Sequence, residues 1–397
     1  MRPPKIAKLT AFALLISCTT NAAPFPAPPI EQFVLYFGAN NNGPTDNSTY
    51  IDLAKRSGLA GYGWQSNTLP SNYTHGEMNG IDAATALSNA APTLPVFVYR
   101  HFQMAWRLFD VQRAADDDPT AHGMFLKDND NTIGSTECRQ NIPGGGTSPL
   151  YTFVVNQSAG DFWSNQVVGE LINESKHAVN AVFFDETDWS ACGYNFIKDS
   201  CTNISDNYKI KDLRAKLPFI RKTADALTNA GKWPIFSSKN LLSDAWTGLP
   251  TTAKRPCLIP HDEYFNALRG ADYGRFYEFW MTGNSADLDA ATIANVILEG
   301  KSGNVGFIAR ASADKDAQCG VSLCEQGSVG VVKLSYSLAA FMIARTSPYS
   351  YFGVSAGWYS PCWCWHSEYD EAAKCGTPIA PAIRTSLYSF FSLHNLI

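Results

Sequence analysis

The chain has 397 residues, of which 45% are hydrophobic, 17% charged and 13% aromatic, and its formal net charge is -5 at pH 7. This composition is typical of a packed globular protein and excludes a disordered or collagen-like chain. The sequence contains no basic tract, and phosphate binding depends on clustered Lys and Arg, so we expect no nucleic-acid partner. A neutral or weakly charged substrate fits this charge better.

The N-terminus has the layout of a signal peptide. Arg2, Lys5 and Lys8 precede a short apolar run over Leu9–Ile16, and small residues follow up to Ala23. The run is shorter than the roughly 20 residues that a membrane-spanning helix needs. We predict a signal peptide over 1–23, a single mature domain over 24–397 without a membrane span, secretion, and a monomer. The alternative is a lipoprotein box ending at Cys18.

Short β-like runs then alternate with helix-like stretches, which is the α/β pattern. Eight candidate strands match a (β/α)8 TIM-type barrel with elaborated loops: Phe33–Ala39, Gly58–Trp64, Leu94–Tyr99, Ala178–Phe184, Pro234–Ser237, Cys257–Pro260, Gly303–Ala309 and Tyr351–Ser355. Helices are expected over Ser164–Glu174, Lys209–Ala230, Leu288–Leu298 and Val332–Thr346. A polar insertion, Asp116–Pro149, precedes the fourth strand.

Acidic residues follow two of these strands, and in such barrels the strand ends carry the chemistry. After the fourth strand come Asp185, Glu186, Asp188 and Trp189, and after the sixth come Asp262 and Glu263. Glycoside hydrolysis needs two carboxyl groups, one protonated as acid and one ionised as nucleophile or base. We expect Asp185 with Glu263 to form this pair, with Asp262 as the rival of Glu263 because adjacent residues of an extended segment point opposite ways.

The alternative is that these acids have only a structural role and cap the helices that follow, and Glu186 and Asp188 suit that role. Glu278, inside an aromatic-rich stretch that predicts a further strand or helix near the site, is another candidate. Aromatic faces bind the C–H patch of a sugar ring while polar groups take its hydroxyls. Expected binding residues at other strand ends are Trp64, Tyr99, Arg100, His101, Lys239, Asn240 and Arg310. Trp358 is expected to form a sugar platform with Trp363 and Trp365, or else to pack under the disulfides.

Nine cysteines follow the predicted signal, so most should be paired in an oxidising compartment and one should be left over. Close spacing favours Cys192–Cys201 and Cys319–Cys324, with Cys375 pairing to Cys362 or Cys364. The Cys-Trp-Cys spacing is not that of a usual zinc site, and we predict no metal or other cofactor. Acceptor sequons for N-glycosylation occur at Asn47, Asn72, Asn156, Asn173 and Asn203.

Several segments together resemble the glycoside hydrolase-like barrel families, in particular the group known as glycosyl hydrolase-like family 15. The resemblance rests on Asn156–Ser158, Asp161–Trp163 and Asn180–Asp185, and on a closing segment from Gly353 to Pro378. It implies a (β/α) barrel that acts on carbohydrate, with Asp185 and Glu263 at the matching acid positions. The insertion before the fourth strand and the Cys-rich Trp358–Cys375 segment depart from the pattern.

Two functions from different classes remain on the sequence alone. The first is a glycoside hydrolase, and the second is a barrel that binds a polysaccharide or oligosaccharide without cleaving it. A lyase or a transglycosylase is a broader alternative to the first. A serine hydrolase is disfavoured because no Gly-x-Ser-x-Gly motif joins a strand to a helix.

Overall fold

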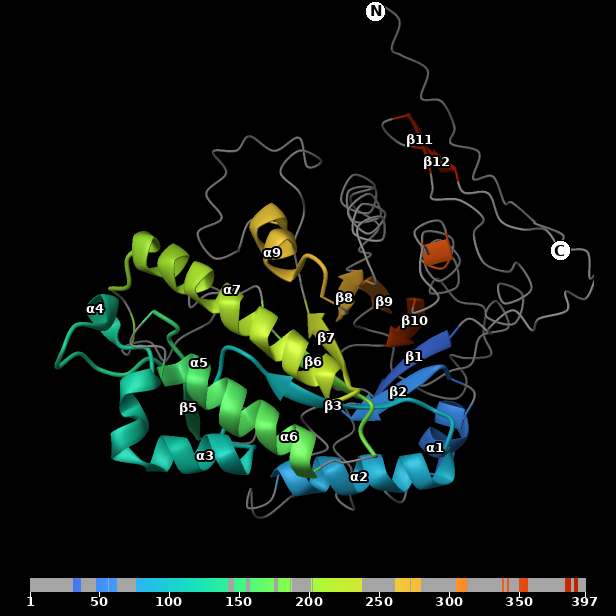
Figure 1. Cartoon of the computed structure of the whole chain (residues 1–397), viewed down its shortest axis with the longest axis horizontal. Helices are drawn as coiled ribbons and strands as arrows, with labels where there is room; N and C mark the ends of the chain where they lie inside the picture. Colours follow the sequence, from blue (N-terminus) through green and yellow to red (C-terminus); the bar gives the residue numbers. More distant parts are fainter. Residues whose placement is uncertain are drawn as a thin grey trace, which may run out of the picture.

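The computed structural model describes residues 31–36, 48–55, 57–62, 76–141, 146–154, 158–174, 178–185, 187, 201, 203–237, 261–271, 273–279, 305–312, 338, 341–342, 350–355, 383–386 and 389–391. A curled parallel sheet lies at the centre, with helices outside it (Figure 1). Each strand pairs with the next in chain order and β10 pairs with β1, so the hydrogen-bonded order closes. Its strands are β1 (Glu31–Tyr36), β2 (Leu59–Tyr62), β3 (Val96–His101), β6 (Ala181–Asp185), β7 (Trp233–Ser237), β8 (Tyr273–Phe279), β9 (Val305–Ser312) and β10 (Ser350–Ser355). The predicted α/β barrel is confirmed in this general form.

Seven of the eight predicted strand ranges overlap strands of this sheet. The assignment of the sixth strand was wrong. The range Cys257–Pro260 lies outside the described residues, and the sixth place in the pairing order belongs to β8, which pairs with β7 and β9. Between β7 and β8 lies helix α9 (His261–Leu268), so Asp262 and Glu263 begin a helix and do not end a strand.

Residues alternate between the two faces of each strand, as the pleat requires. One face packs against the helices through residues such as Val98, Val182 and Phe236. The other face carries a separate cluster at the barrel axis, with Leu59, Phe97, Tyr99, Ala181, Phe183, Ile235, Ile308 and Tyr351. Large rings fill this interior, and Gly274 makes room for one of them, since a Cβ there would lie 2.7 Å from the ring of Trp233.

The helices cover the outer face of the sheet. Helix α2 (Gly76–Ala90) packs on β2 and β3, and the long helix α7 (Asp206–Asn229) packs on β7 while contacting α6 (Val168–Glu174) and α9 (Figure 1). Helix α7 begins where the Ser205 hydroxyl accepts a hydrogen bond from the Tyr208 N–H, and it stops before Gly231, whose φ is 70°. The remaining helical elements in the described part of the chain are α1 (Ser48–Lys55), α3 (Asp110–Asp117), η3 (Pro119–Met124), α4 (Asp128–Asn131), α5 (Ser158–Phe162) and η4 (Trp163–Val167).

Predicted helices over Ser164–Glu174 and Lys209–Ala230 are confirmed by η4, α6 and α7. Residues 288–298 lie outside the described part, as do most of 332–346. Two short antiparallel pairs stand apart from the barrel sheet: β4 (Arg139–Asn141) with β5 (Thr147–Pro149), and β11 (Ile383–Ser386) with β12 (Ser389–Phe391). None of the helices in the described residues is long and apolar enough to cross a membrane.

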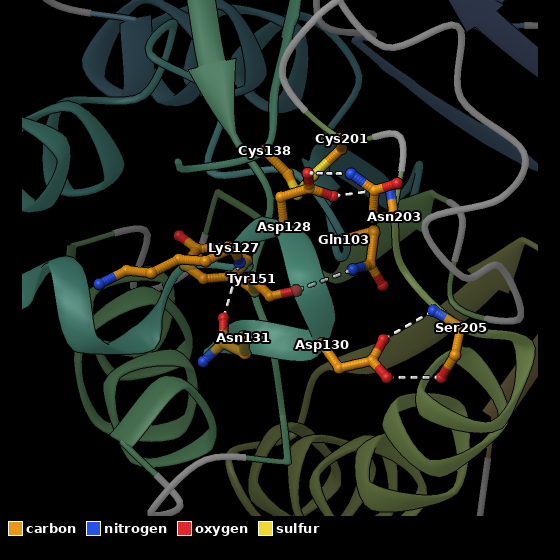
Figure 2. The surroundings of a disulfide bond; sticks show 10 residues. All are labelled: Gln103, Lys127, Asp128, Asp130, Asn131, Cys138, Tyr151, Cys201, Asn203 and Ser205. Atoms are coloured by element: carbon orange, nitrogen blue, oxygen red, sulfur yellow. Dashed lines mark hydrogen bonds between the residues drawn. A yellow bond between two sulfur atoms is a disulfide. The ribbon is translucent and has the colours of Figure 1, made fainter. Parts of the chain in front are cut away.

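The polar insertion between β3 and β6 is anchored by polar contacts and a disulfide. Buried Asp116 accepts hydrogen bonds from Arg139 and Arg107. The carboxylate of Asp128 accepts from Asn203 and that of Asp130 from Ser205, beside the disulfide Cys138–Cys201 (Figure 2). The Cα atoms of this disulfide are 5.3 Å apart.

The predicted pairing of Cys192 with Cys201 was therefore wrong, because Cys201 bonds to Cys138. Sequence proximity suggested the shorter loop, but the fold of the insertion brings Cys138 to the segment that precedes α7. The other predicted disulfides lie outside the described residues.

Candidate active site

Asp185 ends the fourth strand of the barrel order, where the sequence predicted a functional carboxylate. It alternates with Ala181 and Phe183, which belong to the interior cluster, so its position lies on the barrel-axis face. The residue is only 8% exposed. Its Oδ2 accepts a hydrogen bond of 2.8 Å from the hydroxyl of Tyr99. The hydrogen bond from Tyr99 fixes the orientation of this buried carboxylate at the end of its strand.

Tyr99 and His101 lie on the same face of β3. The register pairs Tyr99 with Phe183 and His101 with Asp185. The ring of Tyr99 stacks on Phe183, and Trp106 packs edge-on against both Tyr99 and His101. The structure therefore brings these two predicted binding residues to the side of Asp185.

The imidazole of His101 has a defined orientation. Its Nδ1 accepts a hydrogen bond of 3.0 Å from the backbone N–H of Met104. A ring nitrogen that accepts carries no proton, so in the neutral ring the proton sits on Nε2. His101 can thus offer an N–H donor next to Asp185.

Arg100 occupies the opposite face of β3. Its register partner is Phe184, which belongs to the core between sheet and helices. The guanidinium donates to the carbonyl of Tyr99 and lies 4.4 Å from the ring centre of Phe109. Through these contacts Arg100 packs against the end of β3.

Ser237 ends the neighbouring strand β7 and follows Ile235 on the barrel-axis face. Its carbonyl accepts from the Thr187 hydroxyl, which also contacts the hydroxyl of Tyr264 on α9. Thr187 thus links the segment after β6 to the end of β7 and to α9. Ser237, Thr187 and Trp106 were missed from the sequence, where each stands one or a few residues from a named candidate.

Glu263 forms an ion pair with Arg214, whereas the sequence predicted that it pairs with Asp185 across the site. Its two oxygens accept from Arg214 of α7, at 2.7 and 2.8 Å. The hydrogen bond and charge of Arg214 hold the pKa of Glu263 below its usual value. This pair joins two helices of the outer layer. The sequence predicted Glu263 in an extended segment after a strand, whereas the structure places it in the first turn of α9, since an Asp-Glu sequence after an apolar run suits a helix start equally well.

Glu278 and Arg310 belong to the barrel strands. Glu278 is the penultimate residue of β8, and the register pairs it with Arg310 of β9. Counting from Ile308 of the interior cluster, both positions lie on the barrel-axis face. Asp262 is the second residue of α9. The other predicted site residues lie outside the described part of the chain: Trp64, Glu186, Asp188, Trp189, Lys239, Asn240 and Trp358.

Within the described ranges, no three His, Cys, Asp or Glu side chains gather in a way that could hold a metal ion.

Comparisons with known proteins give weak likenesses to solved structures. No family model matches the chain, and no curated protein matches its sequence. An endo-1,4-β-D-mannanase from Thermotoga petrophila RKU-1 is 8% identical, covering 83% of this chain and 88% of its own, with a TM-score of 0.47. A β-glucosidase 2 from Trichoderma reesei is 10% identical, covering 79% of each chain, with a TM-score of 0.44. A type I 3-dehydroquinate dehydratase from Clostridium difficile is 8% identical, covering 88% of this chain and 92% of its own, with a TM-score of 0.38. The resemblance to glycosyl hydrolase-like family 15 stays a prediction, and we draw the function from the site residues.

Proposed function

We propose that this chain is a secreted glycoside hydrolase that cleaves a polysaccharide or oligosaccharide with Asp185 and Glu278 as its carboxylate pair. The observation that carries the proposal is Asp185 itself, buried at a strand end on the barrel axis and bonded to the Tyr99 hydroxyl. The signal-peptide layout of residues 1–23 supports secretion. The disulfide Cys138–Cys201 supports it too, because such bonds persist in oxidising compartments.

The register supports a (β/α)8 barrel of the TIM type. Following the strand pairs once around the sheet and back to β1 gives a net stagger of eight residues over eight strands. A shear of eight is the value of TIM barrels, in which alternate strands contribute the side chains of one interior layer.

This stagger supports a common layer for positions 185 and 278. One step beyond the Phe184–Phe236 pair, Asp185 lies beside Ser237, and Ser237 pairs with Phe276 of β8. Because the sheet is staggered by one residue per strand, the residue of β8 at the same height along the barrel axis as Asp185 lies two residues beyond the one reached by following the strand pairs. Two residues beyond Phe276 is Glu278.

Two strand spacings of about 4.8 Å separate the two backbones by about 10 Å. Acidic side chains that point inward from such positions can bring their carboxyl groups within the roughly 5–9.5 Å that glycosidases use. In the retaining arrangement, Asp185 attacks the anomeric carbon while Glu278 gives its proton to the leaving oxygen. Glu278 then takes a proton from the water that releases the sugar. In the inverting arrangement, one of them activates that water directly.

Glu263 fits the acid role less well than Glu278. A general acid must hold its proton until the leaving oxygen takes it, which requires a raised pKa. Arg214 lowers the pKa of Glu263 through its hydrogen bonds and its charge. We therefore assign Glu263 to the packing of α9 against α7.

The test is the release of reducing ends from a panel of plant, algal and fungal polysaccharides. We expect activity in the wild type and a loss of at least about a thousandfold, or ~4 kcal/mol, in both Asp185→Asn and Glu278→Gln. Glu263→Gln is the matched control, because it makes the same chemical change in a carboxylate of the outer helices. It should keep activity within about threefold.

Loss of activity in Glu263→Gln but not in Glu278→Gln would contradict this pair. A wild type that binds a polysaccharide of the panel but releases no reducing ends would favour the non-catalytic carbohydrate-binding barrel. Product analysis separates hydrolysis from a lyase or transglycosylase reaction.

A further inference from the structure

Within the part of the chain that the structure describes, the hydroxyl of Ser237 makes no hydrogen bond. The residue is 0% exposed, and its Oγ has no partner among the described residues. Its backbone carbonyl is satisfied by Thr187, so the unpaired atom is the side-chain oxygen alone. A buried hydroxyl without a partner is unfavourable, because it has lost its hydrogen bonds to water.

Two other buried hydroxyls, those of Ser148 and Thr187, have hydrogen-bond partners, whereas those of Ser164 and Thr223 resemble Ser237 in having none among the described residues. The Oγ of Ser148, which is equally buried, accepts from the backbone N–H of Arg107. The Oγ1 of Thr187 donates to Ser237 and contacts Tyr264. What distinguishes Ser237 is its place on the barrel-axis face at the strand end next to Asp185.

We propose that the Ser237 hydroxyl binds a hydroxyl group of the sugar residue held at Asp185, and so helps to set which sugar is accepted. The inference rests on the proposed function, since it needs a saccharide at the mouth. A serine hydroxyl can donate and accept at once, as a sugar hydroxyl can. The apolar residues Ile235 and Phe183 of the same cluster would strengthen such a bond by excluding water.

The test combines stability and binding in one variant, Ser237→Ala. In the unliganded protein we expect an unchanged or higher melting temperature, by about 1–3 °C, because the unsatisfied hydroxyl is removed. Binding is measured by calorimetry with the hexasaccharides of cellulose, mannan, xylan and chitin, in the Asp185→Asn background to prevent turnover. The best-bound hexasaccharide should bind about tenfold more weakly when Ser237 is also alanine.

Ser148→Ala is the matched control, and it should lower the melting temperature while leaving the affinity unchanged. Equal affinity with and without the Ser237 hydroxyl would overturn this inference and leave the proposed function standing. A lower melting temperature in Ser237→Ala would also overturn it, since the hydroxyl would then have a structural role. If a protein with serine at 237 binds none of the four hexasaccharides and the wild type releases no reducing ends across the polysaccharide panel, the proposed function is overturned, and this inference with it.

Discussion

At the scale of single residues, the hydrogen bond between Tyr99 and Asp185 is the contact that most directly supports the proposed site, because it orients the carboxylate. Phenylalanine at 99 would keep the stacking on Phe183 and lose the 2.8 Å hydrogen bond to the carboxylate. Because a hydrogen bond to a charged group contributes about 1.5–3 kcal/mol, we expect Tyr99→Phe to lower kcat roughly tenfold to a hundredfold. Tyr208→Phe, which loses a hydroxyl contact to Thr152 outside the mouth, should leave kcat unchanged. Equal effects of the two variants on kcat would count against a role for Tyr99 at the site.

At the scale of elements, the insertion between β3 and β6 depends on Asp116. Burial alone would raise the pKa of this carboxyl, but the hydrogen bonds and charges of Arg139 and Arg107 outweigh it and lower the pKa. A carboxyl whose pKa is lowered on folding stabilises the fold above its unfolded pKa of about 3.9, and this contribution is lost as the pH falls through the folded value.

Asp116→Asn should therefore lower the free energy of unfolding by about 2–3 kcal/mol at pH 7, with a difference from wild type that shrinks below about pH 4. Urea unfolding at pH 7 and at lower pH values measures this. Asp117→Asn is the control, because Asp117 bonds the same Arg107 from an exposed position, and it should cost less than about 0.5 kcal/mol. A difference for Asp116→Asn that stays constant down to pH 2 would contradict the assignment.

The elements that the sequence predicted well are those with short runs of β-branched and aromatic residues, such as Val96–His101 and Ala181–Asp185. The sequence indicated a further strand or helix around Glu278 but did not assign β8 to the sixth place, because Gly274 and Arg275 interrupt its apolar run. Gly274 admits the ring of Trp233, and the guanidinium of Arg275 lies 5.1 Å from the ring centre of Tyr264 on α9. Both reasons depend on residues that only the fold brings close.

At the scale of the whole molecule, the closed order of the strands decides which carboxylates can meet. The sequence predicted Asp185 at a strand end because a buried strand runs directly into it, but Glu278 could be proposed as its partner only once the register was known. The pairing of polar residues in the insertion was equally hidden, since Asp128 and Asn203 lie far apart in the chain. Local pattern therefore predicts strands and strand ends, while the stagger of the sheet determines which ends share a layer.

The most direct test of the proposed site is a crystal structure that measures the distance between the carboxyl carbons of Asp185 and Glu278. We expect about 5–5.5 Å for a retaining enzyme or about 6.5–9.5 Å for an inverting one, with both groups facing the barrel axis. A Glu278 side chain on the outer face, or a separation beyond about 12 Å, would contradict the pair and with it the proposed hydrolase.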